Sequence, residues 1–169
     1  MKKTIIDLFE DSVVKYGAKT FLLEKKHRAF EPTTYAETRE QALETGAGLA
    51  AAGIRPGDKV AILSEGCNAW ITSELGVFYA GAVSVPLSVK LEESNDLLFR
   101  MRHAEVRALF VSKYQLSKIR RIRAELPQVE HIIVIGHTPL EAGETALGTL
   151  RRMGRDYLAA NREEFLAIG

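Results

Sequence analysis

Residues 59–87 read KVAILSEGCNAWITSELGVFYAGAVSVPL, and this stretch decides the fold class. An apolar run at 59–64 is followed by a segment at 68–79 whose apolar residues recur at helical spacing, and a second apolar run follows at 82–87. Short apolar runs on either side of such a segment are typical of a strand–helix–strand unit. Two strands joined through a helix run parallel, so the stretch predicts a parallel sheet with buried strands.

The same alternation continues along the chain. Apolar runs at 108–112 and 131–135 follow helical segments at 92–103 and 114–125. The pattern predicts an α/β fold with a mostly parallel sheet, flanked by helices on both faces and joined by right-handed crossovers. We expect the inner strands to be residues 60–63, 83–85, 109–111 and 132–135.

The segment before this core predicts a helix at 4–16, a hairpin of strands at 20–24 and 29–33, and a second helix from Thr34. Thr4 with Asp7, and Thr34 with Glu37, have the spacing of capping boxes. Pro32 favours an edge position in the hairpin, because proline has no N–H to donate to a strand on its other side.

The last part of the chain has a different character. Residues 138–145 predict a loop, and residues 146–168 predict a charged helix with no strand after it. We therefore divide the chain into an α/β subdomain at 1–137 and a loop with a helical tail at 138–169. We expect the tail to be less well anchored, with its packing partners outside this chain.

Composition limits the function classes. The 169 residues are 46% apolar and carry a net charge of +1, which suits one globular domain without a strong field for nucleic acid or anionic membranes. Cys67 is the one cysteine, so neither an internal disulfide nor a cysteine metal cluster is expected, and a reducing compartment fits. The longest apolar run, 75–85, is shorter than the ~20 residues of a membrane span. We expect a cytoplasmic protein, with peripheral membrane association left open.

Two glycine patterns resemble phosphate loops. Gly46 and Gly48 fit a dinucleotide-binding pattern, but they lie inside a helical segment rather than between a strand and a helix. We interpret them as small residues that let helices pack closely. Gly143 and Gly148 have the spacing of a Walker A loop, but the lysine that this loop requires is absent, so we discard that interpretation.

Other reactive or charged residues give weaker signals. The basic residues of 114–125 favour a solvated helix face over a nucleic-acid patch: Lys118, Arg120, Arg121 and Arg123. The four histidines have no metal-ligand spacing: His27, His103, His131 and His137. Cys67 lies at a predicted helix start, but no base is placed near it by sequence.

Four short motifs occur in order through nearly half of the chain. They are Thr34-Tyr35-Ala36-Glu37, then Gly53-Ile54-Arg55-Pro56-Gly57-Asp58-Lys59-Val60, then Asn68 with Trp70, and finally Phe78-Tyr79-Ala80-Gly81-Ala82-Val83-Ser84-Val85-Pro86-Leu87. This series resembles the opening of the adenylate-forming superfamily, which includes acyl-CoA synthetases, peptide-synthetase adenylation domains and luciferases. Within this superfamily, His103-Ala104-Glu105 resembles the long-chain fatty acyl-CoA synthetases.

The resemblance implies the N-terminal subdomain of an acyl-CoA synthetase-like fold. It implies a ligase that joins a carboxylate to CoA with ATP, releasing AMP and pyrophosphate, with Mg²⁺, ATP and CoA as cofactors of the full-length enzyme and fatty acids as substrates. The family's phosphate loop, ribose-binding Asp and catalytic Lys are not matched in this sequence. We therefore expect a scaffold that is inactive alone, without catalytic residues, metal ligands or a bound cofactor.

The resemblance suggests one contact with a cofactor. In the family, the stretch after the equivalent of Pro86 can lie near the path of CoA, and Ser88 and Lys90 are the polar candidates there. A solvent-facing loop is the alternative. Lys90 could meet a phosphate of CoA as a point charge.

A rival hypothesis remains for the whole chain, namely a stand-alone flavodoxin-like binding or interaction module without enzymatic activity. The ligase hypothesis adds one expectation about association. Apolar surface that a longer enzyme covers would be exposed in this chain, and such surface tends to find partners, so self-association is expected.

Overall fold

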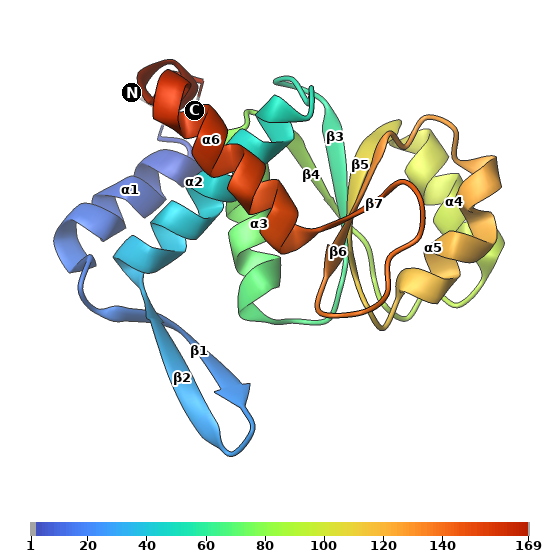
Figure 1. Cartoon of the computed structure of the whole chain (residues 1–169), viewed down its shortest axis with the longest axis horizontal. Coiled ribbons are helices and arrows are strands. Elements are labelled where there is room, and N and C mark those ends of the chain that lie inside the picture. Colours follow the sequence, from blue (N-terminus) through green and yellow to red (C-terminus); the bar gives the residue numbers. More distant parts are fainter. Residues whose placement is uncertain (1–2, 169) are drawn as a thin grey trace.

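The computed structural model describes residues 3–168, so the outermost positions of the predicted segments 1–137 and 138–169 lie outside it. Its centre is a five-stranded parallel sheet in the order β4-β3-β5-β6-β7, with helices on both faces (Figure 1). The strands are β3 Lys59–Leu63, β4 Val83–Pro86, β5 Val106–Ser112, β6 His131–Ile135 and β7 Glu144–Ala146. The predicted fold class is confirmed.

Two expectations about the sheet are wrong. Residues 83–85 were expected in an inner strand, but β4 is an edge of this sheet and Val83 is 47% exposed. Apolar content alone does not separate an edge strand from a central one, whereas Pro86 in β4 is the residue type that edges tolerate. The second error is β7, which takes up the end of the predicted loop at 138–145. Its three residues, two of them polar, are too few to show a strand period.

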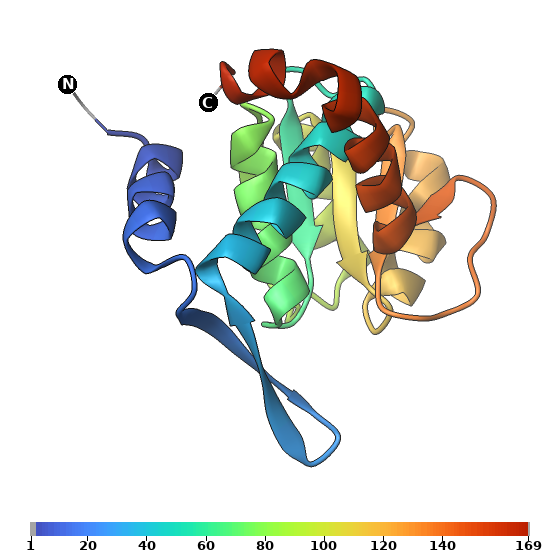
Figure 2. The ribbon, with the colours of Figure 1, turned by 60° about the vertical axis from the view of Figure 1, so that its left-hand side comes forward.

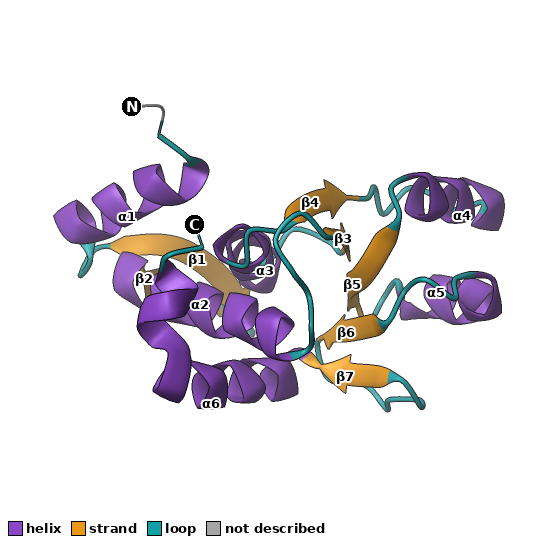
Figure 3. Ribbon diagram, turned by 90° about the horizontal axis from the view of Figure 1, so that it is seen from above, coloured by secondary structure: helices purple, strands orange, loops and turns teal. Residues whose placement is uncertain are grey.

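Alternate side chains of the central strands pack into two cores. On one face, the residues pointing towards helices α4 (Ser94–His103) and α5 (Leu116–Ile122) are Ala61, Leu63, Leu109, Val111, Ile132 and Val134. On the other face, the residues packing with helices α2 (Tyr35–Ala51), α3 (Asn68–Tyr79) and α6 (Leu147–Leu166) are Val60, Ile62, Ala108, Phe110, Ile133 and Ile135. Figure 3 shows these two groups of helices on opposite sides of the sheet. Burial on both faces explains why these strands are continuously apolar.

The N-terminal helix α1 (Ile5–Tyr16) leads into a hairpin of β1 (Thr20–Lys26) and β2 (Ala29–Thr34), which projects from the body (Figure 2). Both predicted capping boxes are formed, by Thr4 before α1 and by Thr34 before α2. Glu10 ties α1 to the body, since its carboxylate accepts hydrogen bonds from Arg39 at 2.8 Å and from the Tyr79 hydroxyl at 2.6 Å.

Helix α2 is packed closely between two neighbours through its glycines. A Cβ added at Gly46 would lie 2.5 Å from the Gly76 carbonyl oxygen of α3. A Cβ at Gly48 would lie 2.3 Å from the Leu150 oxygen of α6. These glycines therefore serve helix packing, as the sequence analysis favoured, and their amides are not available to a pyrophosphate.

Helix α6 corrects the expectation for the tail. Its packing partners lie within this chain, because Leu158 and Phe165 are buried against residues of α2, and Arg151 donates hydrogen bonds to Thr45 of α2 and Thr72 of α3. Figure 2 shows α6 lying along α2. A kink at Asn161, where φ is −128°, bends its last turns over this layer. None of the helices described between residues 3 and 168 has the length and apolarity needed to cross a membrane.

Candidate functional site

The carboxyl edge of the sheet is where the fold places a ligand site. The chain adds β4 on one side of β3 and then β5 on the other side. The loops after β3 and β5 therefore diverge towards opposite faces. Ligands of open α/β sheets bind in the crevice that forms at such a point.

A cavity of about 400 Å³ lies at this point. Its lining comes mainly from the last residues of β5 and β6 and from the residues that follow β3, β5 and β6, with one side chain from the hairpin: Glu24, Ser64, Glu65, Gly66, Cys67, Ala69, Ser112, Lys113, Tyr114, Ile135 and Gly136. We refer to this cavity as the switch-point pocket. Its polar residues follow apolar strands directly, so strand ends such as Ser64-Glu65 and Ser112-Lys113 were a signal that the sequence analysis did not use.

Hydrogen bonds hold the walls of the switch-point pocket together. The Gln115 side chain donates to Glu65 Oε1 at 2.6 Å and so connects the loop after β5 with the loop after β3. The Glu24 carboxylate of β1 accepts the backbone N–H of Asn68 at 3.1 Å, at the first residue of α3. A carboxylate at a helix N-terminus satisfies a free backbone donor and complements the helix dipole. The hairpin is thereby fixed to the site, although Glu24 is distant in sequence.

Cys67 is the N-cap residue of α3, as the sequence predicted, and is half-buried in the pocket wall. No histidine is among the residues lining this pocket, so its lining does not contain the Cys–His pair that activates a cysteine nucleophile. The same residues, 3–168, form no cluster of three or more side chains suited to a metal ion.

Ser88 and Lys90 lie at the same edge, in the loop between β4 and α4. Both are exposed, and neither lines the switch-point pocket. The Ser88 hydroxyl accepts the backbone N–H of Lys90 at 3.2 Å, and the Ser88 carbonyl accepts that of Leu91 at 3.2 Å, so the segment forms an ordered turn. The turn is thus held by backbone N–H groups, and the contact of Ser88 and Lys90 with CoA stays a prediction.

Neither glycine pattern among the described residues suits a phosphate of ATP. The glycines of the dinucleotide-like pattern are covered by helix backbone, as described above. Gly143 and Gly148 have free space around them, but no lysine follows the second glycine to meet a phosphate. We therefore derive no step of adenylation from this chain.

The expectation of a solvated basic face at 114–125 is wrong for most of its four residues, of which Arg123 follows the end of α5 directly. Lys118 is 8% exposed and makes three contacts with the loop after β4. Arg120 pairs with Glu144 at 2.7 Å, and Arg123 donates to the Leu126 carbonyl at 2.8 Å. Arg121 is exposed as predicted.

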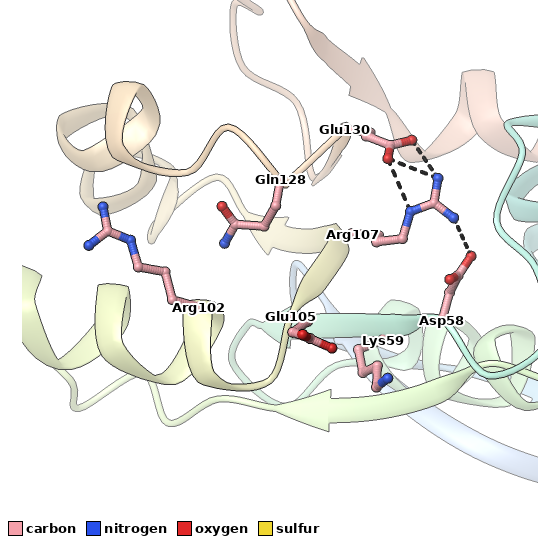
Figure 4. A pocket seen from close by; sticks show the side chains of 7 residues that line it. All are labelled: Asp58, Lys59, Arg102, Glu105, Arg107, Gln128 and Glu130. Carbon is pink, nitrogen blue, oxygen red and sulfur yellow. Dashed lines mark hydrogen bonds and ion pairs between the residues drawn. The ribbon is translucent and has the colours of Figure 1, made fainter.

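A second cavity, of about 480 Å³, lies at the amino edge of the sheet. Figure 4 shows Arg107 between Asp58 and Glu130, with ion pairs to both, while Arg102 lies apart. Arg107 stands at the start of β5, Asp58 precedes β3 and Glu130 precedes β6. The charges are thus already paired across three strand starts. We interpret this cluster as a clamp on the sheet rather than as a binding site.

Two ion pairs, Arg107–Glu130 of the clamp and Arg120–Glu144, predict how the free energy of unfolding depends on pH. Hydrogen bonds from Arg107 hold the pKa of Glu130 below its ordinary value of 4.5, and hydrogen bonds from Arg120 do the same for Glu144. Since the unfolded chain has the higher pKa, it binds more protons in acid. This contribution to the free energy of unfolding is therefore complete above about pH 4.5 and is lost as the pH falls.

Urea unfolding between about pH 6 and about pH 3 measures this dependence. Arg107→Met should flatten the acid limb, because Glu130 then titrates near its ordinary value in the folded chain as well. A variant with the same acid limb as the unchanged chain would show that the clamp does not couple to folding.

Comparisons with known proteins bear on the fold and on the family. A family model described as AMP-binding enzyme matches residues 9–163. The long-chain-fatty-acid–CoA ligase of Thermus thermophilus is 29% identical over 84% of this chain and 27% of its own length. The chloroplastic long-chain-fatty-acid–[acyl-carrier-protein] ligase AEE15 of Arabidopsis thaliana is 28% identical over 64% of this chain and 15% of its own length.

Solved structures of CoA ligases share the fold of this chain. The anthranilate CoA ligase AuaEII in complex with anthranoyl-AMP superposes with a TM-score of 0.79 and 28% identity, covering 87% of this chain and 27% of that one. A long-chain-fatty-acid–CoA ligase from Archaeoglobus fulgidus, at 18% identity, shares the fold with a TM-score of 0.78 over 91% of this chain and 30% of its own. The chain thus spans less than a third of the length of these similar proteins.

Proposed function

Because this chain belongs to the AMP-binding enzyme family, we propose that it is the N-terminal part of an AMP-forming acyl-CoA ligase. The observation that carries the proposal is the family match, which runs through nearly the whole chain from residue 9 to residue 163. In the proposed reaction, a carboxylate attacks ATP to form an acyl-adenylate and pyrophosphate. The CoA thiol then displaces AMP to give the thioester. ATP, Mg²⁺ and CoA are the cofactors of this reaction.

Long-chain fatty acids are the substrates that we propose. Two of the similar proteins are named for long-chain fatty acids, one as a CoA ligase and one as an acyl-carrier-protein ligase. The anthranilate CoA ligase shows that an aromatic acid is accepted on the same fold. The chain length of the acid is therefore the finer part of the proposal. We place the enzyme in the cytoplasm.

This chain's share of the work is scaffolding. Its sheet brings the loops after β3, β4 and β5 to one edge, and the hydrogen bonds of Gln115 and Glu24 hold the walls of the switch-point pocket. In the proposed enzyme, Ser88 and Lys90 present a hydroxyl and a positive charge to CoA. The groups that stabilise charge on the transferring phosphate belong to other parts of the enzyme.

The test is product formation by the ligase that carries this chain. Incubated with ATP, Mg²⁺, CoA and a series of carboxylic acids, it should produce acyl-CoA and AMP in equal amounts, fastest with long-chain fatty acids. Chromatography of nucleotides and thioesters measures both products. Formation of ADP, or turnover with no dependence on CoA, would contradict an AMP-forming acyl-CoA ligase. A preference for aromatic acids would overturn only the substrate class.

A further inference from the structure

Lys118 of α5 is a buried lysine with an unusual set of partners. It is 8% exposed and is surrounded on its helix by the buried side chains of Leu116, Ile119 and Ile122. Burying an ammonium is costly unless each of its donors finds an acceptor. The burial of the Lys118 ammonium therefore has to be explained by the acceptors that it binds.

The three donors of Lys118 meet three acceptors, all from one loop. Its Nζ donates to the carbonyl oxygens of Val89 at 2.9 Å and Leu91 at 3.1 Å, and to Glu92 Oε1 at 2.8 Å. A lysine ammonium has three N–H groups and no acceptor, so its bonding capacity is used completely. The loop belongs to the connection between β4 and α4, so Lys118 joins two segments that are far apart in sequence.

The loop at 88–92, to which Lys118 donates, alternates between inward and outward residues. Val89 and Leu91 pack against the core beneath α4 and α5. Ser88, which precedes Val89, and Lys90, which lies between Val89 and Leu91, are exposed. The carbonyls that bind Lys118 thus belong to the inward residues, and fixing them leaves the polar residues facing solvent on an ordered turn.

We propose that Lys118 is a positioning residue, which holds the loop at 88–92 in the conformation that presents Ser88 and Lys90 to the phosphate groups of CoA. The inference rests on the proposed function, since CoA is its ligand. Lys118 itself does not touch CoA. Its effect passes through the carbonyls of Val89 and Leu91, so losing the ammonium disorders the loop, whereas losing the Lys90 charge leaves the loop ordered.

Two experiments test these effects separately: nuclear magnetic resonance of the ¹⁵N-labelled 169-residue chain tests the order of the loop, and the ligase that carries this chain tests CoA binding. Hydrogen exchange of the Lys90 and Leu91 amides, which donate to Ser88, measures the order of the loop without any ligand. Titration of the ligase that carries this chain with CoA, and with pantetheine as the analogue without phosphates, measures binding by calorimetry. Amides of β5 report whether each variant remains folded.

Lys118→Met should raise the exchange rates of the two loop amides at least about tenfold, since local opening then replaces a fixed turn. It should also weaken CoA binding. Lys90→Met should leave exchange unchanged and raise the CoA dissociation constant roughly fivefold, the scale of one exposed charge contact. Lys118→Arg keeps the charge but not the three-point geometry and should lie between. Lys15→Met, which removes one positive charge from the distant helix α1, is the control for net charge (Figure 1).

The outcomes test the positioning role of Lys118 and the proposed CoA site separately. Unchanged exchange at Lys90 and Leu91 in a folded Lys118→Met chain would overturn the positioning role. Faster exchange with unchanged CoA affinity would overturn it too, because the loop would then be ordered for another purpose. If the unmodified ligase does not bind CoA, the proposed function fails, and if it binds pantetheine equally well, the proposed contact with the CoA phosphates fails. In both cases the exchange data still show whether Lys118 orders the loop.

Discussion

Replacing Gly154 by alanine should lower the free energy of unfolding by about 3 kcal/mol or more, the upper range for forcing extra volume into a packed interior. A Cβ at this position of α6 would lie 1.8 Å from the Glu44 carbonyl oxygen and 2.8 Å from the Gly48 nitrogen. Both atoms are backbone of α2, so neither can turn aside as a flexible side chain would. The two helices must separate, and the contacts of Leu158 and Phe165 beneath α6 weaken with them.

The chain offers a matched control on the same helix. Gly148 also lies in α6, but nothing lies within 4 Å of an added Cβ there. Gly148→Ala should be neutral or stabilise the chain by up to about 1 kcal/mol, because alanine favours the helix more than glycine does. Urea unfolding followed by circular dichroism gives both values. Equal effects of the two substitutions would show that α6 does not pack on α2 as the structure has it.

Close helix packing was only partly predictable from the sequence. Gly46 and Gly48 could be assigned to packing, because their helical context excluded a phosphate loop. Gly154 gave no such signal, since it lies in a charged segment whose apolar residues are sparse. Its close approach to Glu44 depends on how α6 crosses α2, which is a property of the tertiary structure. The expectation of a poorly anchored tail failed for the same reason.

The sheet was predictable where its strands are long and buried on both faces. The strands β3, β5 and β6 follow from continuous apolar runs between helices. The order of the strands did not follow, because apolar content alone does not show which strand lies at an edge, and Pro86 was the one local signal for β4. The strand β7 has only three residues and pairs with β6 along Ile132–Val134, so its partner rather than its own sequence defines it.

The candidate site was less predictable from the sequence than the fold was. Motifs placed the ends of β3 and β4 correctly, yet the switch-point pocket also needs Glu24 from the hairpin and the residues after β5 and β6. Lys118 was predicted on a solvated face, because a lysine in a basic helix is usually exposed. Its burial depends on the carbonyls of Val89 and Leu91, and no sequence pattern shows where backbone carbonyls point.

The second large effect concerns catalysis. We expect the isolated 169-residue chain to show no carboxylate-dependent exchange between ATP and pyrophosphate. Adenylyl transfer needs positioned donors at the phosphates, and losing one such donor typically costs about 10²–10³ in rate. The described residues provide neither a glycine-rich phosphate loop with its lysine nor a metal cluster, so the rate should fall to that of the uncatalysed reaction.

The most direct measurement of the central claim compares two proteins in that exchange assay, with ATP, Mg²⁺, labelled pyrophosphate and fatty acids of several lengths. One is this chain, and the other is the product of its gene read to the natural end. We expect fatty-acid-dependent exchange in the longer protein and none in this chain. Exchange catalysed by this chain alone, or none by the longer protein, would contradict the claim that these residues are the scaffold of an AMP-forming ligase.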